Sequence, residues 1–228
     1  MYDPFKVVRQ FEAALCEYTG APYAVTTTSC SAALMLAVAW HLRPGEPMTA
    51  TLVQSLQKPD GPWIEIPKRT YVSVPMAIIH AGGRPTFRDE NWLGQYQLKP
   101  LPVWDCARIF ISEMYPTLYD HGKRVTGHMM CVSFHWSKTL GIQQGGAILH
   151  DDPEADKWLR QARFDGRIEG VTPKEQAEIY GFKVLGHHCY MSPETAAAGL
   201  VRLHHLPRHN EPLPVDDYPD LSKMEIFK

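Results

Sequence analysis

Short apolar segments alternate with stretches of helical periodicity along most of this sequence, and no other feature restricts its possible folds as strongly. Strands are predicted at 23–25, 63–67, 84–87, 100–104, 129–134 and 145–150. Helices are predicted at 7–18, 31–41, 73–81, 153–163, 173–180 and 193–206. Because this order is typical of a mainly parallel sheet with helices on both faces, the pattern predicts a three-layer α/β fold.

Two of the predicted helices carry local signals. The segment 31–41 (SAALMLAVAWH) is apolar on nearly all sides, which is typical of a helix buried against a sheet. Ser192 precedes Pro193 and Glu194, so the last helix has a capping hydroxyl, a proline at its first position and an acidic first turn. From Leu206 the sequence runs LPRHNEPLPVDDYP, and we expect an irregular arm there.

Composition excludes several classes of protein. Hydrophobic residues make up 44% and charged residues 21% of the 228, as in soluble globular proteins. The formal charge of −2 gives no overall attraction to nucleic acid or to an anionic membrane. No apolar run approaches the roughly 18 residues that cross a bilayer, and no leader peptide is recognisable. The five cysteines never form a CxxC spacing, which favours free thiols and a cytoplasmic location, in a bacterial or phage-infected cell.

Three segments place chemically functional residues at the ends of predicted strands. Residues 26–31 (TTTSCS) bring hydroxyl groups and backbone amides to the start of a helix, which suits a phosphate group or a simple helix cap. Asp105 ends the strand-like PLPVWD, where a carboxylate serves as a catalytic acid, a metal ligand or a cap. Lys138 lies in the polar connection 135–144, where most lysines are solvated charges. Together these three pieces are what a pyridoxal phosphate site requires.

Six motifs in the same order show a resemblance to a known family. They are FEAALCEYTGAPYAV, TSCSAAL, IPKRTYVSVPMAIIHAGGRPTFRD, WDCA, SFHWSK and GGAILHDD. Through them, residues 10–206 resemble the fold-type I pyridoxal phosphate enzymes of the DegT/StrS sugar aminotransferase type. The resemblance implies pyridoxal 5'-phosphate as cofactor, the large-domain fold of these transferases, and a homodimer that completes each site across a two-fold interface. A fully active monomer in light scattering would contradict the dimer.

The resemblance also implies roles for individual residues. Lys138 would hold the cofactor as a Schiff base and, once a substrate amine displaces it, carry the proton. Asp105 would pair with the protonated ring nitrogen, and Tyr71 would stack on the ring. Arg108 would contact the phenolic oxygen of the ring, where the family has glutamine or histidine. The phosphate would be bound by Ser29, Cys30, Ser31 and Ser133, with His135 a further candidate for the same pocket.

Several residues depart from the family's pattern. Cys30 stands where the phosphate turn has glycine, so this turn must accommodate a side chain. His188 and Tyr190 replace an asparagine and an arginine, and His188 is the candidate to reach the phosphate of a neighbouring subunit. Gln144 replaces a glutamate that precedes the glycine pair.

Two pieces of the family's fold are expected to be missing. Residues 89–102 leave no room for the strand and helix that family members have there, which predicts a six-stranded sheet. The small C-terminal domain is expected to be absent, so that residues 1–206 form the pyridoxal phosphate-binding α/β domain and 207–228 a proline-rich arm. The pocket would then be unusually open and would admit a large substrate.

Three functions are compatible with these interpretations. The first is an aminotransferase that passes nitrogen from an amino acid such as glutamate to a keto group. The second is a decarboxylase of an amino-acid group on a large nucleotide- or DNA-linked substrate, such as a glycine-like modified thymine in phage DNA. The third is a cofactor-bound regulator or inactive scaffold, against which the retention of Lys138, Asp105, Tyr71 and Ser133 argues.

Basic and histidine-rich segments suggest two further sites, and neither is favoured. A basic patch would meet DNA phosphates, but a solvated helix face is the simpler interpretation. The patch comprises Arg160, Arg163, Arg167, Arg202, Arg208, His187, His188, His204 and His205. No metal site is expected, because adjacent histidines on a helix point to different faces and have no carboxylate or cysteine at a ligand spacing.

Overall fold

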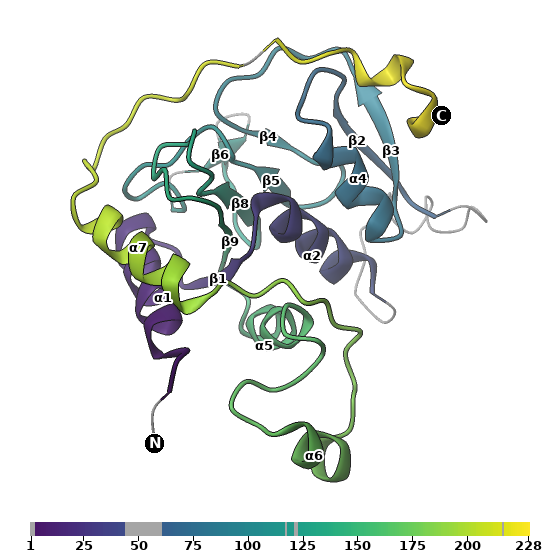
Figure 1. The fold of residues 1–228 in the computed structure, drawn as a ribbon. Coiled ribbons are helices and arrows are strands. Elements are labelled where there is room, and N and C mark those ends of the chain that lie inside the picture. The colour runs from purple at the N-terminus through teal and green to yellow at the C-terminus, as the bar shows by residue number, and fades with distance from the viewer. Residues whose placement is uncertain (1–2, 44–60, 117, 121–122, 216) are drawn as a thin grey trace.

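Helices cover both faces of a central sheet in the computed structural model of this chain (Figure 1). Residues 3–43, 61–116, 118–120, 123–215 and 217–228 are described. The strands in these ranges are β1 (Tyr23–Thr27), β2 (Trp63–Pro67), β3 (Arg84–Arg88), β4 (Tyr96–Gln97), β5 (Val103–Asp105), β6 (Tyr119–Asp120), β7 (Lys123–Arg124), β8 (Met129–Ser133) and β9 (Gly146–His150). The α-helices are α1 (Lys6–Thr19), α2 (Cys30–Leu42), α4 (Ser73–His80), α5 (Pro153–Ala162), α6 (Pro173–Glu175) and α7 (Pro193–His204). A π-helix (Gln176–Tyr180) follows α6, and 3-10 turns occur at Leu221–Lys223 and Glu225–Phe227.

Successive side chains on the central strands point to opposite faces of the sheet and build two separate cores. On β8, Met130 and Val132 belong to the core that includes α1 and α7, whereas Cys131 belongs to the core that includes α2, α4 and α5. On β9, Leu149 and Ile148 divide in the same way. The predicted three-layer α/β architecture is therefore confirmed.

The sheet is mixed, with more antiparallel pairs than predicted. Among the described residues five strands form it, in the order β1–β9–β8–β5–β4, and the β5–β8 pair is its parallel one. A parallel pair needs a crossover connection, usually a helix, between its strands. Residues 134–145, between β8 and β9, contain no helix, so β9 turns back antiparallel to β8.

A short strand, β4, occupies a segment in which we expected none. It pairs antiparallel with β5. Two residues later Lys99 exchanges backbone hydrogen bonds of 2.7 and 3.0 Å with Glu65 of β2, and this bridge connects the parallel pair β2–β3 to the sheet. The described residues thus hold five strands in one sheet and two in its extension, and the expectation of six strands is wrong. The segment from 89 to 102, predicted to have room for neither a strand nor a helix, contains the two-residue strand β4 and no helix.

Local sequence signals account well for the helices. α2 is buried as predicted, with Leu36 and Ala37 fully inaccessible in the core that it shares with α4 and α5. α7 begins at Pro193, and the Ser192 hydroxyl accepts a hydrogen bond from the Thr195 amide at 3.2 Å. The predicted cap is therefore confirmed.

The C-terminal segment, residues 207–228, leaves α7 and crosses the molecule to the side of β2 and β3 (Figure 1). Backbone hydrogen bonds hold it along this path, at Ser112–Arg208 (2.8 Å), Leu213–Arg108 (2.8 Å) and Leu221–Lys68 (2.9 Å). Near its end Phe227 packs against Phe87 of β3, with ring centroids 6.0 Å apart. The division of the chain into a domain and an arm at residue 206 stays a prediction.

Candidate active site

One cavity of about 270 Å³ lies where β1, β5 and β8 end and α2 begins. These three strands run in the same direction, because β1 and β8 each pair antiparallel with β9 while β5 pairs parallel with β8. Their carboxyl ends therefore meet at one edge of the sheet, the place where open α/β sheets bind ligands. The predicted site residues at this cavity are Ser29, Cys30, Ser31, Tyr71, Asp105, Arg108, Ser133, His135 and Lys138.

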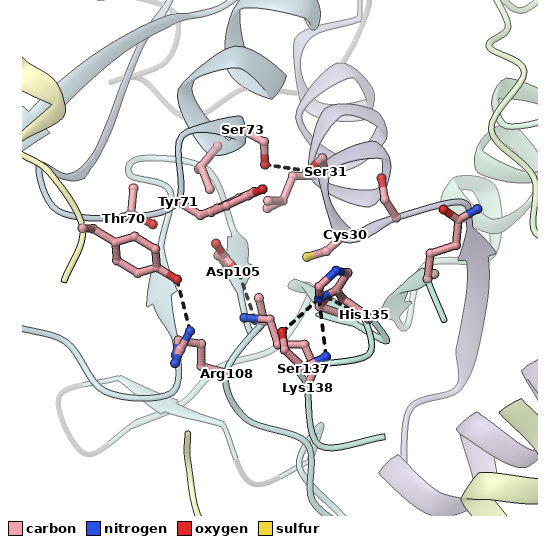
Figure 2. A pocket seen from close by; sticks show the side chains of 18 of the residues that line it. Cys30, Ser31, Thr70, Tyr71, Ser73, Asp105, Arg108, His135, Ser137 and Lys138 are labelled. Atoms are coloured by element: carbon pink, nitrogen blue, oxygen red, sulfur yellow. Dashed lines mark hydrogen bonds between the residues drawn. The ribbon is translucent and has the colours of Figure 1, made fainter. Parts of the chain in front are cut away.

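Figure 2 shows the side chains around this cavity, with Ser31, Ser73 and Tyr71 on one side and His135, Ser137 and Lys138 on another. They come from the first turn of α2, the residues just before and at the start of α4, and the loop after β8. Segments that are distant in sequence thus converge because the topology brings their strand ends together.

The amino end of α2 forms one wall of the cavity. Ser29 is extended, and its hydroxyl caps the helix by accepting a hydrogen bond from the Ala32 amide at 3.1 Å. The Ser31 hydroxyl lies 2.6 Å from that of Ser73. The first amides of a helix have no partner within it and carry the positive end of its dipole, so this wall suits a phosphate group.

Gly146, the second residue of the glycine pair, begins β9 and lies against the start of α2. A Cβ atom at this position would lie 2.5 Å from the backbone nitrogen of Cys30. Because no real side chain tolerates such a contact, glycine is required for β9 to approach the start of α2. The Cys30 side chain is accommodated on the other side, where its Sγ lies 3.5 Å from the carbonyl oxygen of Cys131. Burial raises the pKa of the Cys30 thiol well above its usual value, so the group is a neutral thiol.

Asp105 presents a buried carboxylate to the cavity, with 5% of the residue exposed. Its Oδ1 accepts a hydrogen bond from the Ala107 amide at 2.9 Å, and its Oδ2 accepts one from the Tyr96 hydroxyl at 2.8 Å. The Tyr96 oxygen lies 2.6 Å from the Thr70 hydroxyl, which extends the chain of hydrogen bonds. Burial raises the pKa of Asp105, while these donors and the charge of Lys138 oppose that rise.

Tyr96 contacts the candidate site through Asp105 and was not predicted from the sequence. It lies on β4, the strand that was not expected, and it is buried beside Asp105 of the neighbouring strand. The sequence YQL at 96–98 has the period-two pattern of a strand, with Tyr96 and Leu98 buried on either side of a half-buried Gln97. The alternation of apolar and polar residues at 96–98 is the sequence signal that predicts a strand there.

The change Tyr96→Phe tests this hydrogen-bond chain. We expect a loss of about 1–3 kcal/mol in the free energy of unfolding, because the buried Thr70 and Asp105 oxygens lose a partner. We also expect the pKa of Asp105 to rise, since a bond that favours its charged form is removed. Urea unfolding and an NMR titration of the carboxyl carbon measure the two effects. Tyr180→Phe, at an exposed position, is the control, and equal effects in both variants would contradict the assignment.

Lys138 lies in a tight turn after β8. Its backbone amide donates to the His135 carbonyl at 2.8 Å, and the His135 ring nitrogen Nδ1 lies 2.9 Å from the Ser137 hydroxyl. The Lys138 side chain is half-buried at the cavity, and its charge lowers the pKa values of Asp105 and Cys30 against the larger effect of burial. The lysine is therefore within electrostatic reach of the carboxylate across the cavity.

Arg108 is buried, and the C-terminal segment engages its guanidinium group. Nη1 donates to the Tyr218 hydroxyl at 3.1 Å, and Nη2 donates to the Pro214 carbonyl. The Leu213 amide donates to the Arg108 carbonyl at 2.8 Å. Arg108 thus lines the cavity, as Tyr218 does, and links it to a part of the chain that sequence analysis treated only as an arm.

His188 does not line this cavity. Its side chain is exposed, and its Nδ1 lies 3.0 Å from Asp165 Oδ2. A role at the site of a second subunit stays a prediction. Three of the five arginines of the basic patch have acidic partners: Arg160 and Arg163 form ion pairs with the buried Glu12, and Arg167 lies 3.9 Å from Asp165.

The described part of the chain bears on metal binding and on membrane-spanning helices. Within it, no group of three or more histidine, cysteine, aspartate or glutamate residues is arranged to hold a metal ion. None of the helices described there has the length and apolar character needed to cross a membrane.

Comparison with known proteins agrees with this geometry. The profile of the DegT/DnrJ/EryC1/StrS aminotransferase family matches residues 2–100 and 105–212. Spore coat polysaccharide biosynthesis protein SpsC of Bacillus subtilis (strain 168) is 25% identical over 236 residues, covering 87% of this chain and 57% of SpsC. The sugar aminotransferase CalS13 from Micromonospora echinospora has a TM-score of 0.64 at 18% identity, covering 88% of this chain and 60% of CalS13. GDP-4-keto-6-deoxymannose-3-dehydratase, solved with a trapped PLP-glutamate geminal diamine, has a TM-score of 0.65 at 20% identity, covering 89% and 61%.

A strand-end carboxylate, a loop lysine and a helix terminus around one cavity, on this three-layer fold, define a large domain of the pyridoxal phosphate transferase type. The chain belongs to the DegT/DnrJ/EryC1/StrS aminotransferase family, as the motifs predicted. It spans between 57% and 61% of the length of the three relatives above.

Proposed function

We propose that this chain binds pyridoxal 5'-phosphate and transfers amino groups, with Lys138 as its catalytic residue. The observation that supports this most strongly is the convergence of Lys138, Asp105 and the amino end of α2 on one cavity. Membership of an aminotransferase family favours amino transfer over other reactions of the cofactor. The dehydratase of similar fold indicates that other chemistry also occurs on this architecture.

The residues around the cavity fit this cofactor by their chemistry. The amides at the start of α2 and the Ser29, Ser31 and Ser133 hydroxyls offer donors to a phosphate group, and Gly146 keeps the approach of β9 free of a side chain. The carboxylate of Asp105 accepts one hydrogen bond on each oxygen, which leaves lone pairs for a further donor such as a pyridinium N–H.

Pyridoxal phosphate, when bound, supplies a carbonyl that condenses with amines and a ring that withdraws electrons from the adjacent carbon. Asp105 would hold the proton on the ring nitrogen, because a buried carboxylate stabilises a cation beside it. Lys138 Nζ would hold the cofactor covalently and, once a substrate amine has displaced it, would carry the proton at the substrate carbon as a free amine. Tyr71 would cover one face of the ring.

For the substrates, we propose an amino-acid donor such as glutamate and an acceptor that carries a keto group. Glutamate is the amino acid trapped in the related dehydratase structure, and CalS13 is named a sugar aminotransferase. The homodimer stays a prediction. Exposed apolar side chains near α6, at Ile179, Phe182 and Leu185, are the surface that would support it.

The visible spectrum of the cofactor-loaded protein, recorded before and after glutamate is added, tests this function. We expect the long-wavelength band to decline as the bound cofactor is converted to pyridoxamine phosphate, and 2-oxoglutarate to appear in equal amount. D-Glutamate is the control, because a chiral site should discriminate against it. A band that stays unchanged with glutamate, glutamine and alanine would contradict amino transfer. Release of carbon dioxide from an amino-acid group would instead favour the decarboxylase.

A further inference from the structure

The C-terminal segment carries an aromatic side chain into the wall of the active-site cavity. Tyr218 lines the same cavity as Lys138 and Asp105, although 80 residues separate it from the nearer of the two in sequence (218 − 138). Backbone hydrogen bonds at Leu213 and Leu221 fix the segment on both sides of it. The wall is thus formed by a part of the chain that follows the last α-helix.

Four contacts from three segments of the chain hold Tyr218 in this position: the connection from β2 to α4, the connection from β3 to β4, and the residues after β5. Its hydroxyl accepts a hydrogen bond from Arg108 Nη1 at 3.1 Å, and its carbonyl accepts one from Arg69 Nη1 at 3.1 Å. Its ring lies nearly parallel to that of Trp92, with centroids 6.5 Å apart and an angle of 10°. It meets the ring of Tyr71 edge-on, with centroids 6.4 Å apart.

The partners of Tyr218 are themselves fixed. The Trp92 indole N–H donates to the Arg69 carbonyl at 2.9 Å, so the ring beside Tyr218 is tied to the same residue that holds its backbone. The Arg108 guanidinium also donates to Pro214 of the same segment. Side chains held by several partners lose little further entropy when a ligand arrives, and they present a fixed shape to it.

We propose that Tyr218 is a specificity-determining residue, whose ring limits the size of the amine that reaches Lys138. The inference rests on the proposed function, since it concerns access to the cofactor bound at that lysine. Amines with a narrow substituent next to the nitrogen, such as amino acids, pass this ring, and amines with a bulky substituent there are rejected. With Trp92 and Tyr218 in its wall, the pocket would be narrower than the very open one expected from the sequence.

Oximation of the bound cofactor measures this access without requiring turnover. The full chain loaded with pyridoxal phosphate is mixed with hydroxylamine or with O-benzylhydroxylamine, and the loss of the long-wavelength band is timed. Each rate is divided by the rate for free pyridoxal phosphate with the same reagent. The variants are Tyr218→Ala and Tyr218→Phe. Tyr180→Ala, at an exposed position outside the cavity, is the matched control.

We expect Tyr218→Ala to accelerate the reaction with O-benzylhydroxylamine by about tenfold or more, relative to hydroxylamine, because a steric difference in a pocket is worth at least that much. Tyr218→Phe keeps the ring, so it should discriminate nearly as the wild type does. An unchanged ratio in Tyr218→Ala overturns the proposal. If circular dichroism shows that Tyr218→Ala is unfolded, Tyr218→Leu is measured instead. We expect a smaller rise in the rate with O-benzylhydroxylamine relative to hydroxylamine, and no rise overturns the proposal.

Failure of the proposed function is distinguishable from failure of this inference. A fluorescence titration with pyridoxal phosphate and the Lys138-dependent band are measured first for each variant. Absence of binding and of the band in the wild type overturns the proposed function. If cofactor binding and the band are normal and the ratio of the two oximation rates is the same with and without the Tyr218 ring, only the role of Tyr218 is overturned.

Discussion

Replacing Lys138 with alanine is expected to slow amine turnover by a factor on the order of 10² to 10⁴, the range typical of a lost acid–base group. The long-wavelength band of the cofactor-loaded protein should disappear at the same time, because Nζ is the atom proposed to attach the cofactor. Non-covalent binding should persist, since the amides and hydroxyls at the start of α2 remain in place. Single-turnover kinetics with glutamate and an absorbance scan measure both effects.

Lys174→Ala is the control for this change. Its side chain is exposed on α6, 3.9 Å from Glu178 and outside the cavity, so it should retain both the band and the rate. Added ethylamine should restore part of the rate to Lys138→Ala, because a small amine can occupy the space of the missing side chain and carry the proton. A Lys138→Ala protein that keeps its band or its full rate would remove the lysine from the proposed mechanism.

The largest expected effect on stability is at Glu12, far from the cavity. Glu12 is buried on α1, and its carboxylate pairs with Arg163 and with Arg160 at 2.6 Å, both from the region of α5. Its Oε1 also accepts hydrogen bonds from the amide and hydroxyl of Thr26 on β1, at 2.9 and 2.8 Å. The group thus joins a helix from each face of the sheet to β1, which lies at one edge of that sheet.

We expect Glu12→Ala to lower the free energy of unfolding by about 3 kcal/mol, because the buried guanidinium of Arg163 loses its shorter ion pair and keeps the one with Glu169 at 3.7 Å. Glu12→Gln keeps the shape and should lose somewhat less. Urea unfolding at neutral pH measures both. Glu17→Ala, at an exposed position of the same helix, should change stability by less than about 0.5 kcal/mol. Equal losses at positions 12 and 17 would contradict the role of the ion pairs.

Glu12 also predicts how stability depends on pH. Burial would raise its pKa, but Arg163 and Arg160 outweigh burial and lower it from 4.5 to about 2. Because the folded pKa is the lower one, the stabilisation is complete above about pH 5 and is lost as the pH falls towards 2. The wild type should lose roughly 3 kcal/mol over this interval through Glu12. The free energy of unfolding of Glu12→Gln should fall by roughly 3 kcal/mol less than that of the wild type over the same pH interval.

Much of the fold and of the candidate site could be predicted from local sequence. The order of helices and strands follows from apolar periodicity, the burial of α2 from its apolar surface, and the start of α7 from Ser192 and Pro193. Nine of the ten predicted site residues line one cavity, because they lie at the end of a strand, in the loop after it or near a helix start, and the ends of β1, β5 and β8 meet at one edge. His188 is the one that does not.

Tertiary structure alone decided the features that depend on partners distant in the chain. β9 runs antiparallel to β8 because no helix connects the two strands. β4 forms because β5 supplies its hydrogen-bond partners, and Glu65 of β2 pairs with Lys99 just after it. The chain from Thr70 through Tyr96 to Asp105 joins three segments, so no single segment predicts it. The position of Tyr218 depends on Arg108 and Trp92, more than 100 residues before it. Short-range periodicity determines which elements form, whereas backbone pairing and packing between distant segments determine what the cavity wall contains.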